Sequence, residues 1–474
     1  MPDFPYGKAA FVIMLIALVS AVLLFVAQQR EKSEKFDLVL TTFAANHVPA
    51  YRAAIEQFEK DHNVKISVQV VNGRALNERL QASMAIGAEV PDLVEIMNGT
   101  MGTFTRGPLE DVQFRDLTDL IEEENLKEKI PISRFSLWSS RGRTFALPHD
   151  VHPVMLAYRR DLVEELGIDV ERDLKTWDDF FKVGQRITKD LTGDGAIDRF
   201  MIDLPGPGDV LRLLITQRGG RLINEDGSIA FETEEVVDVF VWYTRASKGP
   251  NRIAFAAGWG QSLSTAVKEG TCLFYFCPDW RTFAFQTDIA SMSGKMALMP
   301  LPAWTEGGIR TSTWGGTGLA FPKGGRNFEL AYKLGKYLYY HPPDLGMRFK
   351  QMNILPPLKE AWTLPELAEP RPYFSGQAIG TMFAALGNDV PAEFVSPYNA
   401  PILARLGEAF GATSRAYENN PEMPVEQLRE IARQQIKIAA DRVRKEINHN
   451  SFQATDKAAG ATTDTPVSVT SGSK

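Results

Sequence analysis

A tryptophan stands directly before two glycines in the stretch RTSTWGGTGLAFPKGG, residues 310 to 325. Gly315 and Gly316 leave the backbone bare, and bare N–H groups bind either a phosphate or the polar atoms of another ligand. A phosphate loop is disfavoured, because a dinucleotide fingerprint needs a glycine where Phe321 stands and a Walker loop needs Gly-Lys-Ser/Thr at a helix start. The stretch instead predicts a flat polar ligand, such as a sugar ring, stacked on Trp314.

Two further tryptophans have neighbours that bear on ligand binding. Asp279 and Trp280 follow the apolar run EGTCLFYFCP, and Trp259 lies between glycines in AAGWGQS. Large aromatic side chains are more often core residues than ligand platforms. Because Trp280 and Trp314 lie beside Pro or Gly at strand ends, we predict that both rings face a cleft. For Trp259 the core alternative is the stronger one.

The stretch GRTFALPHDVHPV carries two histidines and an aspartate close together. Pro153 biases His152 toward an extended conformation, which sends the rings of His149 and His152 to opposite faces and disfavours a shared metal. Asp150 and His152 then share one face, where they offer an acceptor and a donor to ligand hydroxyls. A solvated surface turn is the alternative.

The loop DLTGDGAIDRFM resembles a calcium-binding EF-hand loop, with Asp190, Asp194 and Asp198 as oxygen ligands and Gly195 at the sharp turn. It departs from that pattern at its twelfth position, where Met201 replaces the bidentate glutamate. Structural calcium and a plain Asp/Gly turn both remain open, and no other cofactor is expected.

Catalytic motifs are weak by comparison. The sequence contains neither Gly-x-Ser-x-Gly nor His-Glu-x-x-His, and the paired acids Asp178 and Asp179 fit a helix start. The sequence therefore favours binding over catalysis.

The first elements that must position these residues alternate between strand and helix. FDLVLTTF, VKISVQVV and PDLVEIMN predict strands, and residues 47 to 62 and 76 to 87 have helical apolar spacing. This order predicts a parallel α/β layer, whose ligands bind beyond the carboxyl ends of the strands. Phe43 and Asn46, after the first strand, and Asn98, after the third, are therefore candidate ligand contacts.

A second α/β region begins near residue 152. Thr176 and Asp179 form an expected capping box at the start of one helix. Further helices are expected at residues 234 to 246, 327 to 340 and 425 to 447. The polar, Ala/Thr/Ser-rich residues 448 to 474 have too little apolar surface to fold and are predicted to be disordered.

Composition limits the class of protein. The chain has 474 residues, 44% hydrophobic and 23% charged, with a net charge of −7. It is long enough for two or three domains, and its charge gives no general field for nucleic acid. Cys272 and Cys277, five apart in a strand, are expected to stay unpaired.

The N-terminus predicts a membrane-targeting segment. Residues 9 to 27 contain no charge, and 19 helical residues span about 28 Å, close to a bilayer core. The preferred interpretation is an uncleaved transmembrane anchor; a cleaved signal peptide, giving a secreted protein, is the alternative. Both place residues 36 onward outside the cytoplasm.

Taken together, several pieces make the chain similar to the extracellular solute-binding proteins of carbohydrate-uptake ABC transporters, a family that includes maltodextrin-binding proteins. In chain order these pieces are FEKDHNVKISVQVV with PDLVEI, GRTFALPHDVHPVMLAYRRDLVEELGID with TWDDF, LTGDGAID, GGRLINEDGSIAF, EGTCLFYFCPDW and KMALMPLPAWTEGGIRTSTWGGTGLAFPKGG. LPHDVHPV and TSTWGGTG look most similar to the arabino-oligosaccharide-binding branch. Two features depart from the family pattern: Tyr158-Arg159 replaces Tyr-Asn, and no lipobox cysteine is present.

The resemblance implies an α/β, two-lobed periplasmic-binding-protein-like fold of type II, with a hinge and an interlobe ligand cleft. Residues 36–151 plus 316–355 would form lobe 1, and residues 152–313 plus 357–447 would form lobe 2. It also implies a ring-stacking role for Trp280. The implied protein is a monomer that delivers a mono- or oligosaccharide to ABC transporter permease subunits.

A different class stays open as the alternative function. A cell-surface glycosidase or lyase on a related scaffold would need two carboxylates facing each other across the cleft, about 5 to 9.5 Å apart. Ferric-ion capture by Tyr339 and Tyr340 is disfavoured, because adjacent helical residues do not converge.

Overall fold

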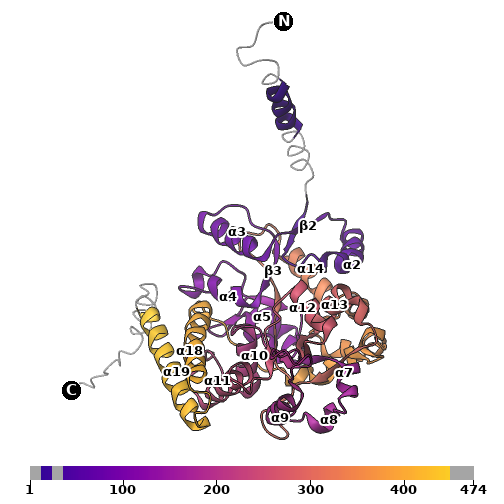
Figure 1. The fold of residues 1–474 in the computed structure, drawn as a ribbon. Coiled ribbons are helices and arrows are strands. Elements are labelled where there is room, and N and C mark those ends of the chain that lie inside the picture. The colour runs from indigo at the N-terminus through magenta and orange to yellow at the C-terminus, as the bar shows by residue number, and fades with distance from the viewer. Residues whose placement is uncertain (1–11, 24–35, 449–474) are drawn as a thin grey trace, which may run out of the picture.

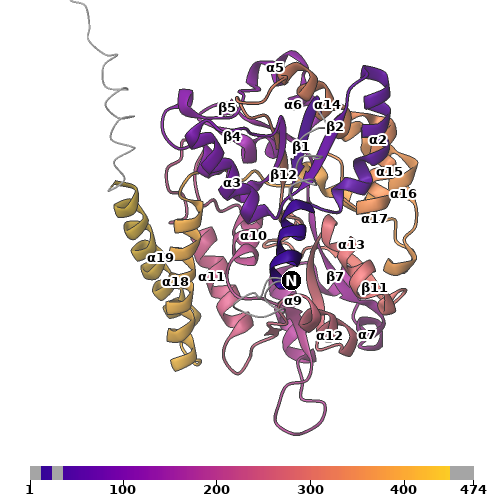
Figure 2. The same cartoon turned by 90° about the horizontal axis from the view of Figure 1, so that it is seen from above.

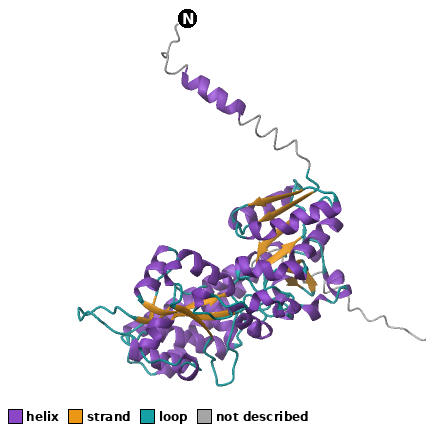
Figure 3. Cartoon of the chain, turned by 90° about the vertical axis from the view of Figure 1, so that its right-hand side faces the viewer, coloured by secondary structure: helices purple, strands orange, loops and turns teal. Residues whose placement is uncertain are grey.

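The computed structural model describes residues 12–23 and 36–448. From residue 36 onward the chain forms two lobes, each built on a five-stranded sheet with helices packed around it (Figure 1). The two groups of strands are clearly separated when the molecule is viewed from the side (Figure 3).

The first lobe contains a sheet with strand order β2-β1-β3-β12-β6. Its strands are β1 (Leu38–Thr42), β2 (Ile66–Val70), β3 (Leu93–Met97), β6 (Ala146–Pro148) and β12 (Thr317–Ala320). β1 pairs in parallel with β2 and β3, as expected for a strand-helix-strand unit, whereas β12 runs antiparallel between β3 and β6. A segment more than 150 residues further along the chain therefore completes this sheet.

Apolar helix faces cover this sheet. Tyr51, Ile55 and Phe58 recur at helical spacing and pack into one core with Leu38 and Leu40 of β1. The helices of this part of the chain are α2 (His47–His62), α3 (Gly73–Ile86), α4 (Asn98–Phe104), α5 (Thr118–Glu123), α6 (Leu126–Lys129), α14 (Phe328–Tyr340) and α15 (Pro342–Met352).

The second lobe contains a sheet with strand order β11-β7-β10-β8-β9. Its strands are β7 (Val154–Arg159), β8 (Phe200–Asp203), β9 (Ala254–Phe255), β10 (Cys272–Pro278) and β11 (Met296–Pro300). β10 is buried at every position, which explains why its seven residues, CLFYFCP, lack an alternating polar face. Both cysteines are buried and free, as predicted.

The helices of the second lobe cover both faces of its sheet. They are α7 (Arg160–Glu165), α8 (Val170–Asp173), α9 (Trp177–Ile187), α10 (Asp209–Arg218), α11 (Glu234–Ser247), α12 (Gln261–Glu269), α13 (Asp279–Asp288), α16 (Pro365–Ala368), α17 (Ile379–Leu386), α18 (Asn399–Asn419) and α19 (Val425–Asn448). α18 and α19 pack along each other and against α11 (Figure 2).

Three chain segments connect the lobes. Residues 149 to 153 join β6 to β7, residues 311 to 316 lead into β12, and residues 353 to 356 follow α15. They are hydrogen-bonded to one another: Val151 N donates to Leu355 O, and Pro153 forms a bridge with Thr313. These contacts link all three connecting segments to one another between the lobes.

Most of the local expectations are confirmed. The six helices expected from periodicity are present, and Thr176 and Asp179 form the predicted capping box. Two linked expectations are wrong. His152 has a φ of 53°, in the left-handed region rather than extended, and the rings of His149 and His152 both lie 3.1 Å from Asp150 Oδ2 instead of pointing to opposite faces. Contacts on both sides, described below, hold this conformation against the bias of the following proline.

The predicted membrane segment, residues 9 to 27, is described only in part. Its residues 12–23 are helical. Within the part of the chain that the structure describes, no helix is both long and apolar enough to cross a membrane. The tail predicted to be disordered lies outside the described residues, except for Asn448 at the end of α19.

Candidate ligand-binding site

A cavity of about 370 Å³ opens between the two lobes. The end of β3 and the start of α4 supply Met97, Asn98 and Gly99 from the first lobe, and α10 and α13 supply Arg212 and Trp280 from the second. The cavity thus lies beyond the carboxyl end of β3, where a ligand was expected from the sheet topology. Its size is within the range of small-molecule sites.

Trp280 and Trp314 both line this cavity, although they are buried to different extents. Trp314 is only 5% exposed and belongs to the core of the second lobe, whereas Trp280 is half-buried. Their rings meet edge to face, with centroids 6.0 Å apart, and the Trp280 indole Nε1 donates to Trp314 O at 2.9 Å. Trp280 is therefore the more exposed ring, and Trp314 fixes its orientation.

The glycine pair allows close approach around these rings. Gly315 has a φ of 106°, and a Cβ at this position would lie 3.1 Å from His152 and 3.2 Å from Trp280. Asn98 fastens the pair to the first lobe, because its Nδ2 donates to Gly315 O and its backbone N donates to Gly316 O. Gly315 and Asn98 line the cavity; Gly316 is not among the lining residues.

Behind Trp280 lies a buried chain of charged side chains. His152 Nδ1 is 2.6 Å from Asp279 Oδ1, and His152 Nε2 is 3.1 Å from Asp150 Oδ2. The same Asp150 oxygen accepts from Thr317 N at the start of β12, and Asp279 Oδ2 accepts from Leu355 N. We call His152, Asp150 and Asp279 the hinge triad, because it ties together all three connecting segments.

The hinge triad holds its histidine charged. Burial alone would lower the pKa of His152, but the two flanking carboxylates outweigh burial and raise the pKa to about 9. The imidazolium and its neighbours likewise hold the pKa of Asp150 well below its usual range, against the opposing effect of burial. None of the three side chains lines the cavity, so they position the cleft rather than face into it in this structure.

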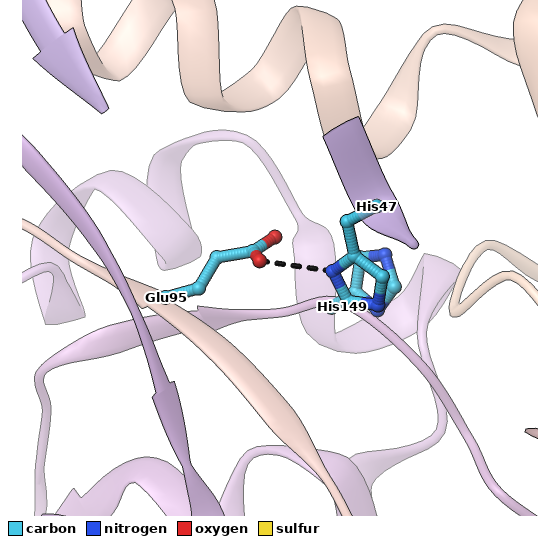
Figure 4. A group of neighbouring side chains, drawn as sticks. All are labelled: His47, Glu95 and His149. Carbon is cyan, nitrogen blue, oxygen red and sulfur yellow. Dashed lines mark hydrogen bonds and ion pairs between the residues drawn. The ribbon is translucent and has the colours of Figure 1, made fainter. Parts of the chain in front are cut away.

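A second buried polar cluster joins His47, Glu95 and His149 in the first lobe (Figure 4). Their potential ligand atoms lie within 4.8 Å of one another, the only such group among the described residues. His47 Nδ1 is 2.9 Å from Glu95 Oε2, and the two histidine rings stack with centroids 4.6 Å apart. Proximity alone would make this cluster a candidate metal site.

The carboxylate of Glu95 is, however, already saturated by hydrogen bonds. Its four donors are Thr42 Oγ1, His47 Nδ1, Tyr51 OH and Tyr339 OH, at 2.5, 2.9, 2.7 and 2.7 Å. Two donors per oxygen fill the lone-pair sites of a carboxylate. The cluster therefore satisfies a buried charge with protein donors. Burial alone would raise the pKa of Glu95, but the charge of the neighbouring His47, with smaller contributions from His149 and Thr42, lowers it.

The calcium-like loop uses its carboxylates in a similar way. Asp190 accepts from the N–H groups of Gly193 and Gly195, Asp194 accepts from Ala196, and Asp198 accepts from Leu191 and Thr192. The loop needs no cation to explain its conformation, and calcium binding there stays a prediction.

The remaining sequence candidates lie away from the cavity. Phe43 packs in the first lobe beside Leu76 and Leu80, and Asn46 is exposed before the start of α2. The core interpretation of Trp259 is wrong, because this side chain is 54% exposed and lies edge to face against Trp314 at 5.7 Å. Residue type and position near strand ends made these three residues candidates, but the packing of neighbouring segments places their side chains outside the cavity.

Sequence reasoning missed the charged residues of the cavity. Asp209, Arg212 and Glu393 line it, and Arg212 Nη1 lies 3.1 Å from Glu393 Oε2. Arg212 and Thr216 lie on one face of α10 at a spacing of four residues, a signal that could have identified them. No comparable signal marks Glu393, which is brought to the cavity by a loop.

The chain is similar in sequence to a family of binding proteins. A family model described as bacterial extracellular solute-binding protein matches residues 44–341. The arabinooligosaccharide-binding protein of Bacillus subtilis is 25% identical over 370 residues, which cover 76% of this chain and 82% of that protein. The arabinooligosaccharide-binding protein of Halalkalibacterium halodurans is 23% identical over 409 residues, covering 83% and 88%.

A solved structure shows the same fold. The sugar-binding protein MalE of Xanthomonas citri has a TM-score of 0.69 and 18% identity, and the match covers 87% of this chain and 100% of that one. At this identity the similarity establishes the two-lobed architecture and nothing finer.

Proposed function

The chain belongs to the bacterial extracellular solute-binding protein family, and we propose that it captures a mono- or oligosaccharide between its two lobes and delivers it to the permease subunits of an ABC transporter. The observation that carries the proposal is the interlobe cavity, which has a half-buried indole, Trp280, on one side and the amide of Asn98 on the other. An apolar ring face and fixed polar groups match a sugar, which has apolar and hydroxyl-bearing surfaces.

Arabino-oligosaccharides are the first sugars to test. Both curated relatives carry that name and align with three quarters or more of this chain. TSTWGGTG, the stretch that resembles this branch, lies at the cavity and contributes Trp314 and Gly315 to its lining.

We also propose the lobe boundaries and the location. Residues 36–151 with 316–355 form one lobe, and residues 152–313 with 357–447 form the other, in keeping with the membership of the two sheets. The family description supports an extracytoplasmic location. Anchoring to the membrane by residues 9 to 27, and action as a monomer, are further parts of the proposal.

Catalysis is the weaker alternative. The two carboxylates among the described lining residues, Asp209 and Glu393, both bond to Arg212 rather than facing each other across an open cleft. A glycosidase would need such acids free to donate a proton and to attack or activate water. The family and both relatives are named for binding, which also favours transport.

A thermal-shift screen tests the proposal. One sugar among arabino-oligosaccharides, galactosides, maltodextrins and their monosaccharides should raise the melting temperature, because a ligand at 100 times its dissociation constant adds about 2.7 kcal/mol of stability. Chromatography after overnight incubation should return that sugar intact. No shift with any sugar would reject the proposal, and shortened products would favour the enzyme.

Chelation tests the calcium hypothesis. We expect equal melting temperatures with and without EDTA, because backbone N–H groups already occupy the loop carboxylates. If EDTA lowers the melting temperature and Asp194→Ala removes that effect, the loop binds calcium after all.

A further inference from the structure

A loop that the sequence did not mark as functional spans the cleft between the lobes. Residues 390 to 398, which we call the interlobe strap, run from the end of the short 3-10 helix Gly387–Asp389 to α18. On the second lobe, Glu393 of the strap bonds to Arg212 and Thr216 of α10. The strap also lines the cavity, so it forms one of its walls.

The strap is held on the first lobe as well. A Cβ at Gly102 of α4 would lie 2.2 Å from the carbonyl oxygen of Ser396, a distance that only glycine permits. Arg106 Nη2 donates to Pro397 O at 3.4 Å. Because backbone packing holds the strap at this end, Glu393 occupies a defined place in the cavity wall.

Glu393 and Arg212 are charged groups with unused bonding capacity. Glu393 Oε1 accepts from Thr216 Oγ1 at 3.2 Å, and Oε2 accepts from Arg212 Nη1 at 3.1 Å. Each carboxylate oxygen has two acceptor sites, so each retains one for a ligand hydroxyl. The side chain of Glu393 is 9% exposed and that of Arg212 is 16% exposed, which leaves limited access to both from the cavity.

Glu393 and Arg212 together also set the net charge at this end of the cavity. Arg212 Nη2 has a second, weaker carboxylate partner in Asp209 at 3.4 Å, but Asp209 is 58% exposed and its charge is largely screened by solvent. Arg221, the other lining cation, stacks over Phe394 of the strap at 5.5 Å. Without Glu393 this end of the cavity would present two cations against one exposed carboxylate.

We propose that Glu393 is the specificity-determining residue of the cleft: its free acceptor sites bind the hydroxyls of a neutral sugar, and its charge, by neutralising Arg212, excludes sugars that carry a carboxylate. This inference rests on the proposed sugar-binding function and defines its ligand class as uncharged. Removing the Glu393 carboxylate converts the same place into a site for a uronic acid.

The test compares two disaccharides that differ in the group at C6, α-1,4-galactobiose and α-1,4-digalacturonic acid, by titration calorimetry. The wild type should prefer the neutral disaccharide. Glu393→Ala should weaken neutral binding and strengthen acid binding, shifting the ratio of the two affinities at least tenfold toward the acid. Glu393→Gln, which keeps a similar shape, should shift the ratio in the same direction and covers the case in which the alanine variant is unstable.

Two further variants separate this effect from a general loss of structure. Glu393→Ala with Arg212→Gln should lose most of the gain in acid binding, because the arginine that Glu393 neutralised is gone and only Arg221, which stacks over Phe394, remains among the lining cations. Glu422→Ala, at an exposed position beyond α18, should bind like the wild type. Acid binding by Glu393→Ala should also weaken as sodium chloride increases, because salt screens the attraction between the ligand carboxylate and Arg212.

An unchanged affinity ratio in folded Glu393→Ala and Glu393→Gln would overturn the inference, as would a gain in acid binding that persists in full without Arg212. Failure of the proposed function would look different. In that case no sugar in the thermal-shift screen would stabilise the wild type. The role of Glu393 would still be decided by whether its variants gain binding of the acidic disaccharide.

Discussion

Replacing Trp280 by alanine is expected to weaken sugar binding ten- to a hundredfold while the protein stays folded. Trp280 is the more exposed of the two indoles that line the cavity, and its ring offers an apolar face to the ligand. Covering a ring of this size resembles burial of a large apolar side chain, worth roughly 1.5 to 3 kcal/mol. Each 1.4 kcal/mol corresponds to about a factor of ten in the dissociation constant.

Two other tryptophans serve as comparisons in the same titration. Trp362 is also half-buried but is absent from the residues that line the cavity, so Trp362→Ala should bind sugar like the wild type. Trp314→Ala should lower both binding and the melting temperature, because Trp314 is a core residue that also orients Trp280. If folded Trp280→Ala binds with wild-type affinity, the sugar does not stack on this ring.

Replacing His152 by asparagine is expected to lower the free energy of unfolding by about 3 to 5 kcal/mol at pH 7, the usual cost of breaking a buried ion pair. The change leaves Asp150 and Asp279 buried without the cation between them. Asparagine tolerates the left-handed backbone found at this position, so the effect reports the lost charge rather than strain. Urea denaturation measures it.

The loss of stability caused by His152→Asn should become smaller as the pH rises. The pKa of His152 is raised to about 9 in the folded protein, from about 6.5 in an unfolded chain. Its stabilising contribution is therefore complete below pH 6.5 and is lost as the pH rises through 9. The difference in stability between wild type and His152→Asn should narrow by roughly 2 kcal/mol between pH 7 and pH 10.

An exposed histidine provides the control for this experiment. His62→Asn, at the end of α2, should lower the stability much less than His152→Asn, because this exposed ring contacts only Phe58 and forms no ion pair. A difference between wild type and His152→Asn that stays constant up to pH 10 would mean that His152 is not held charged by its two carboxylates.

The fold was predictable in outline because its elements have strong local patterns. Tyr51, Ile55 and Phe58 follow helical spacing, and the parallel pairing of β1 with β2 and β3 follows from strands alternating with helices. The position of β12 in the first sheet depends on a contact between distant segments. No local pattern encodes such a contact, and only the family resemblance implied it.

The candidate site was predictable where residue type and strand ends coincide. Trp280, Trp314, Gly315 and Asn98 line the cavity because each follows or precedes a strand at the cleft. Asp150, His152 and Asp279 were recognised as functional candidates for the same reason. Whether a polar side chain faces the cavity or bonds to another segment, however, depends on partners remote in sequence, such as Leu355 and Thr317.

Glu393 is the residue of the candidate site that the sequence was least able to predict. Its place in the cavity wall depends on contacts of the strap with Gly102 and Arg212, which lie 291 and 181 residues earlier in the chain. A single acid in a loop has no pattern that separates it from a solvated one. Only the three-dimensional arrangement shows that it pairs with an arginine beside a ligand cavity.

A crystal structure of the protein with the sugar identified by the thermal-shift screen is the most direct test of the proposed function. We predict electron density for the sugar in the interlobe cavity, with one ring against Trp280 and hydroxyls within hydrogen-bond distance of Asn98 or Glu393. Sugar bound outside this cavity, or within it but away from Trp280 and the strap, would contradict the assignment of the site.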